Sequence, residues 1–342
     1  MKAYTLKVVD VRAETSDTIT LRFKQPGLKK IKYSAGQYLT LIFRINGRRY
    51  LRPYSFSSSP SVDLTLDVTV KRVPHGIVSN HIHDQVKKGD VIEVLEPMGD
   101  FGTNCFDQRD VFLWGAGSGI TPLISLAKEL LSQKNGHRIY LIYGNRDVDQ
   151  TIFLELIQSL EHAYKDRFNV VYFYTKLSVE PTLPSWVQGR ISKKSIVDII
   201  NRYQISEALH LICGPLDLKE SVVSTLLDLG FPESMIFSED FELVKDPNDF
   251  VDIYTQNVIV QFEQRETLIE VVKGQAILET ALDAGIDLPY SCQTGNCNTC
   301  KAEILRGTVK MIGGGKERSD LRSNEALLCC SYPTSNDVVL KI

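Results

Sequence analysis

The stretch VFLWGAGSGITP, residues 111–122, decides the fold of the middle of the chain. An apolar run leads into a turn with three glycines, and a helical pattern follows over residues 122–133. A glycine-rich turn between a strand and a helix is where backbone N–H groups bind phosphate. The turn is not a G-x-G-x-x-G fingerprint, because position 120 is isoleucine. A packing turn that binds no ligand is the plain alternative.

Strand-like and helix-like segments alternate on the carboxyl side of this turn. Strand-like runs occupy residues 138–143, 170–174 and 208–213, and a helical pattern occupies residues 152–163. Such alternation predicts an α/β domain with a parallel sheet and crossover helices. We assign this domain to residues 104–240.

Residues 1–103 have a different pattern, without the alternation of strand-like and helix-like segments. Short alternating or β-branched runs lie between turn residues, at positions 18–23, 38–43, 64–70 and 90–94. This pattern predicts an antiparallel barrel or sandwich.

Beyond the α/β domain, the polar residues 246–249 indicate a linker, which we set at residues 241–255. Residues 256–342 begin with two strand-like runs, 258–262 and 267–271, and continue with a helical pattern over 276–284. The carboxyl-terminal part is therefore predicted to be a small α+β module.

Composition narrows the class of protein. The chain has 342 residues, enough for two or three domains, with 39 Lys and Arg against 42 Asp and Glu and a net charge of −3. This balance argues against a nucleic-acid partner. No apolar run approaches the roughly 18 residues of a membrane span, and the first residues turn polar too early for a signal peptide. We expect a cytoplasmic protein.

Cysteines cluster near the carboxyl end. Cys292, Cys297 and Cys300 have C-x4-C-x2-C spacing, and Cys329 follows much later. This is the plant-type [2Fe-2S] ferredoxin spacing, and Gly295 can provide the sharp turn that the loop needs. Zinc is the main competitor, although structural zinc sites usually pair two C-x2-C knuckles.

The fourth ligand could be Cys329 or Cys330. Side chains of adjacent residues in extended backbone point to opposite faces, so one of the two is expected to bind. Cys330 is then interpreted as a small buried apolar side chain. The segment resembles plant-type ferredoxin domains, and the distance to Pro333 in that pattern favours Cys329. Asn298 stands where that family commonly has glycine, and we expect it to adopt the left-handed conformation.

Two short motifs in the first domain carry a second resemblance. Arg-Pro-Tyr-Ser at residues 52–55 and Gly-Ile-Val-Ser at residues 76–79 together resemble the R-x-Y-S and G-x-x-S elements of the ferredoxin-NADP reductase superfamily. The resemblance implies an antiparallel β-barrel that binds FAD in preference to FMN. It also implies that Tyr54 stacks on the flavin, that Ser55 reaches N5, and that the phosphates are held by Arg52, Ser79 and backbone amides near Gly76. A half-exposed strand edge and a helix N-cap are the plain alternatives.

The middle domain matches the same superfamily. Its glycine turn resembles the G-x-G-x-G-x-x-P turn of these reductases, which implies nucleotide contacts from Gly115, Gly117, Gly119 and Thr121. Later motifs add Arg146, Cys213 and Gly214, with Cys213 beside the nicotinamide or simply a buried strand end.

The end of the domain, Glu-Asp-Phe at residues 239–241, resembles the E-x-aromatic ending of flavin reductases. This implies that Phe241 covers the flavin and that Glu239 positions or relays a proton, a solvated loop carboxylate being the alternative. Lys176 lies where such reductases often bind the 2'-phosphate, which favours NADPH, although NADH stays open.

Taken together, the chain resembles reductases with a fused β-grasp ferredoxin domain, a group that serves phenylacetyl-CoA epoxidase and ketosteroid hydroxylases. The resemblance implies that electrons pass from NAD(P)H through FAD and a [2Fe-2S] cluster to a separate oxygenase, hydroxylase or desaturase. Two other functions stay open: the same redox chain feeding a hybrid-cluster or stress-response acceptor, and a non-catalytic metal-binding interaction protein.

Overall fold

The computed structural model describes residues 3–27, 30–102, 110–133, 136, 138–176, 185–243, 245–313 and 318–342. Cys105 and the predicted boundary at residue 103 lie outside this part. No helix in the described part of the chain is long and apolar enough to cross a membrane. By its packing the chain divides into two compact units, Met1–Phe43 with Tyr54–Glu239 and Arg44–Pro53 with Asp240–Ile342.

The amino-terminal residues form an antiparallel sheet with the strand order β4-β3-β6-β1-β2-β5. Its two edges meet, because Phe56, just after β4, forms a bridge with Val68 of β5. The sheet is therefore a closed barrel, which confirms the barrel and rejects the sandwich. Its strands and its one described helix are β1 (Ala3–Thr15), β2 (Thr18–Lys24), β3 (Tyr38–Ile45), β4 (Arg48–Ser55), β5 (Thr65–Lys71), α1 (Ile77–Gln85) and β6 (Val91–Leu95).

Strand β4 contains the first flavin motif, residues 52–55. Pro53 lies within it, although proline cannot donate a ladder hydrogen bond. The position is tolerated because β4 is the last strand in the order of its sheet. Tyr54 and Ser55 are thus held by strand backbone.

The middle of the chain forms a parallel sheet with the order β10-β9-β8-β7-β11-β12. Its strands are β7 (Asp110–Ala116), β8 (Ile139–Asn145), β9 (Phe168–Tyr174), β10 (Trp186–Gln188), β11 (Ala208–Cys213) and β12 (Ile236–Glu239). Between them lie η1 (Gly117–Gly119), α2 (Ile120–Ser132), α3 (Leu154–Ala163), α4 (Lys193–Tyr203), α5 (Leu216–Asp228) and η2 (Glu233–Met235).

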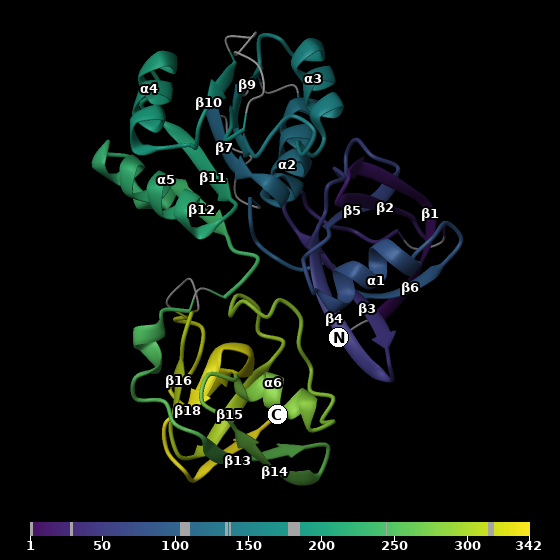
Figure 1. Ribbon diagram of the computed structural model, residues 1–342, viewed down its shortest axis with the longest axis vertical. Coiled ribbons are helices and arrows are strands. Elements are labelled where there is room, and N and C mark those ends of the chain that lie inside the picture. Colours follow the sequence, from purple (N-terminus) through teal and green to yellow (C-terminus); the bar gives the residue numbers. More distant parts are fainter. Residues whose placement is uncertain are drawn as a thin grey trace. The chain divides into compact units, whose positions relative to one another are not determined.

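Helices cover both faces of this sheet, as Figure 1 shows. Helices α2 and α3 pack on one face, while α4 and α5 pack on the other. The central strands β7 and β11 are almost entirely buried, which explains why they are continuous apolar runs without alternation. The predicted α/β domain with crossover helices is confirmed.

The carboxyl-terminal module has a mixed sheet with the order β14-β13-β19-β15-β17 and a ribbon of β16 and β18. Helix α6 packs against β14, as the predicted β-grasp fold requires. The elements are η3 (Pro247–Phe250), β13 (Gln256–Phe262), β14 (Arg265–Val271), α6 (Ile277–Asp283), β15 (Lys301–Arg306), β16 (Val309–Met311), β17 (Glu325–Leu327), η4 (Leu328–Cys330), β18 (Ser331–Pro333) and β19 (Val338–Lys341).

The segment predicted to be a plain linker contains the short helix η3. The Asp246 carboxylate accepts a hydrogen bond from the Asn248 N–H at 2.8 Å and caps this helix, in which Pro247 is the first residue. Phe250 and Ile253 then pack against Tyr332 and its neighbours in the carboxyl-terminal core. The polar residues 246–249 therefore lead directly into packed structure.

Candidate redox site

Three predicted site residues lie side by side at the carboxyl edge of the parallel sheet. Cys213 of β11 is level with Gly115 of β7 on one side and with Glu239 of β12 on the other. The direction of chain progression reverses between β7 and β11, and ligands of open α/β sheets bind at such a point. The register of three strands thus assembles the predicted nucleotide end of the site.

The glycine turn is shaped by close packing at one end and is open in its middle. A β-carbon built on Gly119 would lie 2.0 Å from the carbonyl oxygen of Cys213, so the turn can approach β11 only with glycine there. Gly117 has a left-handed φ of +52°, and a β-carbon there would have no neighbour within 4 Å. The Tyr143 hydroxyl donates to the Gly117 carbonyl at 3.0 Å. Packing of the turn against β11 is therefore enough to require glycine at position 119, whether or not a ligand binds there.

The remaining nucleotide residues lie at neighbouring strand ends. Thr121 is buried in the first turn of α2 and donates to the Ser118 carbonyl at 3.1 Å. Gly214 follows β11 directly. Arg146 and Lys176 are exposed just after β8 and β9, and the Lys176 N–H donates to the Arg146 carbonyl at 2.7 Å. Two residues with cationic side chains are therefore neighbours at the carboxyl edge of the sheet.

Ser55 links the barrel to this edge. It is the last residue of β4 and is buried, and its hydroxyl donates to the Glu239 carboxylate over a long 3.4 Å. Tyr54, the preceding residue, is half-buried. The aromatic residue Phe241 is 45% exposed, and it belongs to the second compact unit. The structure brings Ser55 and Glu239 together although 184 positions separate them.

The other flavin residues make local contacts. Gly76 caps α1, and the buried Ser79 hydroxyl accepts from the Val73 N–H at 3.1 Å and lies 3.4 Å from the Gly76 carbonyl. Ser79 therefore stabilises the turn before the helix, but it is not the N-cap that the plain alternative expects, because Gly76 holds that position. Within the second unit, the Arg52 guanidinium donates to the Leu51 carbonyl at 2.8 Å.

The cysteine loop turns sharply around its own sulfur atoms. Gly295 has a left-handed φ of +73°, as predicted, and Gln293 has one of +59°. The N–H groups of Thr294 and Cys297 donate to the Cys292 sulfur at 3.4 and 3.3 Å. Hydrogen bonds from the Cys297 thiol, and then from Cys329 and the backbone, hold the pKa of Cys292 well below its ordinary value. Such an environment suits a thiolate ligand.

The four predicted ligands are joined by a connected series of thiol contacts. The Cys292 thiol interacts with Cys297, and the Cys329 thiol interacts with Cys292 and Cys300. In the described residues, no group of three or more His, Cys, Asp or Glu side chains is placed to hold a metal ion. A [2Fe-2S] cluster takes four thiolates, so Cys292, Cys297, Cys300 and Cys329 would hold it, and the donor set fits that group.

The premise used to separate Cys329 from Cys330 is wrong. Both lie in the short 3₁₀ helix η4, Leu328–Cys330, and not in extended backbone. The two thiols contact each other, but the Cys330 sulfur also donates to the Leu327 carbonyl at 3.4 Å, whereas the Cys329 thiol contacts Cys292 and Cys300. Both side chains are buried, and the contacts favour Cys329 as the ligand.

Asn298 also differs from expectation. The non-glycine residues with positive φ in the described chain do not include it, so it does not replace glycine as a left-handed residue. Its side chain instead bonds Arg318 and Asp320. Neither Tyr143 nor Arg318 was identified from sequence, because the first has the pattern of a core aromatic and the second that of a solvated loop charge.

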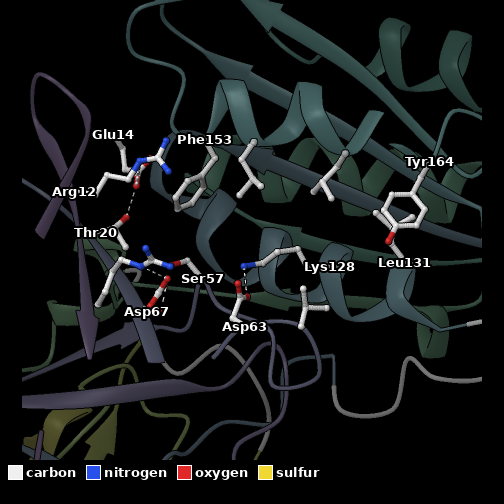
Figure 2. A pocket seen from close by; sticks show the side chains of 14 residues that line it. Arg12, Glu14, Thr20, Ser57, Asp63, Asp67, Lys128, Leu131, Phe153 and Tyr164 are labelled. Atoms are coloured by element: carbon white, nitrogen blue, oxygen red, sulfur yellow. Dashed lines mark hydrogen bonds and ion pairs between the residues drawn. The ribbon is translucent and has the colours of Figure 1, made fainter. Parts of the chain in front are cut away.

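A cavity of about 260 Å³ is lined by no predicted site residue, and Figure 2 shows side chains that line it. Apolar side chains such as Phe153 line it together with paired charges. These pairs are Lys128 with Asp63 at 2.6 Å, Arg22 with Asp67 at 3.2 Å and Arg12 with Glu14 at 3.7 Å. Because its charges are matched within the chain, we assign it no part in the redox site.

Three family models match consecutive parts of the chain. An oxidoreductase FAD-binding domain matches residues 5–102, an oxidoreductase NAD-binding domain matches residues 113–224, and a 2Fe-2S iron-sulfur cluster binding domain matches residues 260–334. The predicted flavin, nicotinamide and iron-sulfur domains are thereby confirmed.

Whole-chain relatives have the same organisation. The ferredoxin reductase component of 3-ketosteroid-9-alpha-monooxygenase from Rhodococcus rhodochrous is 35% identical, over 98% of this chain and 96% of its own. One component of the 1,2-phenylacetyl-CoA epoxidase of Escherichia coli is 30% identical over 98% and 97%. The solved structure of phthalate dioxygenase reductase shares the fold, with a TM-score of 0.68, 23% identity and coverage of 99% and 98%. The chain belongs to the ferredoxin-NADP reductase superfamily, in the group of oxygenase reductase components with a carboxyl-terminal [2Fe-2S] ferredoxin domain.

Proposed function

We propose that this chain oxidises NAD(P)H and delivers the electrons one at a time to a separate oxygenase, hydroxylase or desaturase. The family supports this function, since its relatives include components of a monooxygenase and of an epoxidase. When bound, FAD accepts a hydride and a [2Fe-2S] cluster carries single electrons. The protein's part is to hold these groups and the nucleotide and to exclude competing reactions.

In this proposal the barrel holds FAD. Tyr54 supplies an aromatic face, Arg52 binds a phosphate, and the α1 amino terminus at Gly76 and Ser79 favours phosphate through its dipole and free N–H groups. Ser55 hydrogen-bonds the reacting edge of the flavin, and Glu239 holds that hydroxyl in place. The contact between Ser55 and Glu239 is the observation that carries the proposal, because it joins the flavin strand to the nucleotide edge.

The carboxyl edge of the parallel sheet holds the nucleotide. The turn from Gly115 through Gly117 and Gly119 to Thr121 binds the pyrophosphate at the start of α2. Cys213 and Gly214 border the nicotinamide, Arg146 contacts the dinucleotide, and Phe241 covers the flavin until the nicotinamide displaces it. We propose the domain limits 1–103, 104–240, 241–255 and 256–342 for these tasks.

The electrons leave through the third domain. Cys292, Cys297, Cys300 and Cys329 would hold the cluster, which would supply single-electron chemistry for the acceptor protein. We also propose a cytoplasmic location, and the reduced state of the described cysteines supports it, because cysteines stay reduced in that compartment.

Two artificial acceptors test the order of the relay. Ferricyanide can take electrons from a flavin, whereas cytochrome c is expected to need the cluster. We expect Cys300→Ser to abolish NAD(P)H-dependent cytochrome c reduction while ferricyanide reduction stays within about twofold of wild type. Equal loss of both activities, in a variant that retains its flavin, would argue against this order.

We also propose a preference for NADPH, in which Lys176 binds the 2'-phosphate as a point charge. Its exposed position beside Arg146 supports this proposal. Lys176→Ala should lower kcat/KM for NADPH by roughly tenfold and leave kcat/KM for NADH unchanged. A wild-type preference for NADH, or an equal effect on both nucleotides, would remove Lys176 from the site.

A further inference from the structure

Arg318 reaches back to the cysteine loop from a later part of the chain. Its guanidinium donates to the Gly295 carbonyl through Nη1 at 2.6 Å and to the Asn298 side-chain oxygen through Nη2. These two residues lie between Cys292 and Cys300, which are predicted ligands. Only 14% of the Arg318 side chain is exposed, so a cation is largely enclosed against the loop.

Asp320 holds this guanidinium in a fixed orientation. Its two carboxylate oxygens accept from Arg318 Nε and Nη2, each at 2.8 Å. The same carboxylate accepts from Asn298 Nδ2 at 3.0 Å. The three side chains therefore form a closed triangle, in which each bonds the other two. A bidentate pair of this kind restricts a long side chain that would otherwise be mobile.

Arg318 interacts electrostatically with the sulfur atoms of the cysteine loop. Its pKa is raised mainly by the hydrogen bond to Asp320 and by the charge of that carboxylate, and less by charge interactions with the sulfur atoms of Cys297 and Cys292. Attraction of this kind is mutual, so the guanidinium stabilises negative charge on the loop. Asp320 opposes it, but half of the Asp320 side chain is exposed and water screens that charge more strongly.

We propose that Arg318 is a positioning residue that clamps the cysteine loop and raises the reduction potential of the cluster bound there. Reduction adds one negative charge to the cluster, and a fixed, partly buried cation near the ligands favours that state. Asp320 has the opposite electrostatic effect and keeps the clamp closed. Asn298 is explained as the loop's attachment point for both charges. The inference rests on the proposed function, because it requires the cluster.

The test is the midpoint potential of the cluster in the full-length holoprotein, followed by electron paramagnetic resonance during a redox titration. Arg318→Gln should shift the reduction equilibrium roughly threefold to tenfold toward the oxidised state, at most about 59 mV. Asp320→Asn should shift it in the opposite direction, which a merely structural role would not produce. Arg322→Gln is the control, because Arg322 is an exposed arginine of the same segment and should leave the potential unchanged.

Outcomes at the two residues separate this inference from the proposed function. Wild-type protein without a [2Fe-2S] cluster would overturn the proposed function, and this inference with it. An intact cluster whose potential is the same in wild type, Arg318→Gln and Asp320→Asn would overturn the inference alone. If Arg318→Gln fails to assemble a cluster, Asp320→Asn decides, since only a shift to a more positive potential supports the role of Arg318.

Discussion

The sheet edge and the cysteine loop assemble their site residues in different ways. At the sheet edge, Ser55, Cys213 and Glu239 come from three strands, and their positions depend on barrel closure and strand register. In the loop, Cys292 and Cys297 are neighbours through local backbone turns and N–H···S bonds. One site therefore depends on the fold of a whole unit and the other mainly on local geometry. Substitutions in the loop should therefore impair cluster binding, whereas substitutions at the sheet edge should lower the stability of the unit.

The largest expected effect is in the loop. Cys329→Ser should abolish the visible absorbance of the cluster, because the Cys329 thiol contacts two other predicted ligands, Cys292 and Cys300. Cys330→Ser should retain this absorbance. The flavin content of both variants should match wild type, since the barrel folds around other contacts. Iron analysis and absorbance spectra of the purified proteins measure this. Loss of iron at position 330 alone would reverse the ligand assignment.

The sheet edge should instead lose stability. Gly119→Ala places a β-carbon against the Cys213 carbonyl, so we expect the free energy of unfolding to fall by about 3 kcal/mol or more. Gly144→Ala is the matched control, because a β-carbon there meets its neighbours at 3.5 Å or more. Urea denaturation of the two variants compares them. A Gly119→Ala protein as stable as Gly144→Ala would contradict the packing explanation.

Hydride transfer offers a test of the contact that joins barrel and sheet. Ser55→Ala should slow reduction of the flavin by NAD(P)H roughly a hundredfold in stopped-flow measurements, because the flavin edge loses a hydrogen-bonding group. Ser57→Ala removes another buried barrel hydroxyl, one that bonds Thr69 at 2.9 Å, and should leave this rate nearly unchanged. Equal rates in the two variants would remove Ser55 from the reaction.

A smaller effect concerns the core beneath the sheet edge. His210 is fully buried in β11, its Nδ1 accepts from Trp114 Nε1 at 3.2 Å, and burial lowers its pKa from 6.5 to about 3. The unfolded chain binds a proton below about pH 6.5 but the folded chain does not, so stability is lost as pH falls toward 3. The loss is about 2 kcal/mol at pH 5.

His210→Gln keeps an acceptor for Trp114 and cannot titrate. Its stability relative to wild type should therefore improve by about 2 kcal/mol between pH 7 and pH 5. Denaturation curves at the two pH values measure this difference. A constant difference would mean that His210 accepts a proton in the folded protein.

The comparison also explains what the sequence could predict. The spacing of the cysteines in the loop is local, so Cys292, Cys297 and Cys300 could be proposed as ligands from spacing alone. The parallel sheet followed from the alternation of strands and helices. The contact of Ser55 with Glu239 could not be derived from periodicity, because it depends on how the barrel closes beside β12.

Local backbone conformation and side-chain contacts could not be predicted from the sequence either. The backbone of Asn298 and the 3₁₀ turn at Cys329 differ from expectation. Asn298 bonds Arg318 and Asp320 through its side chain, and the Cys330 carbonyl accepts from the Ile312 N–H at 2.8 Å, contacts that local sequence does not reveal. Arg318 gave no signal in the sequence, since a charged loop residue usually faces solvent. Its contacts become visible only when the later segment is folded onto the cysteine loop.

The most direct test of the account is the composition and electron uptake of the purified chain. We predict about one FAD, two irons and two acid-labile sulfides per chain, and anaerobic titration should reduce both chromophores. Colourless protein that binds zinc through its cysteines and carries no flavin would contradict the account.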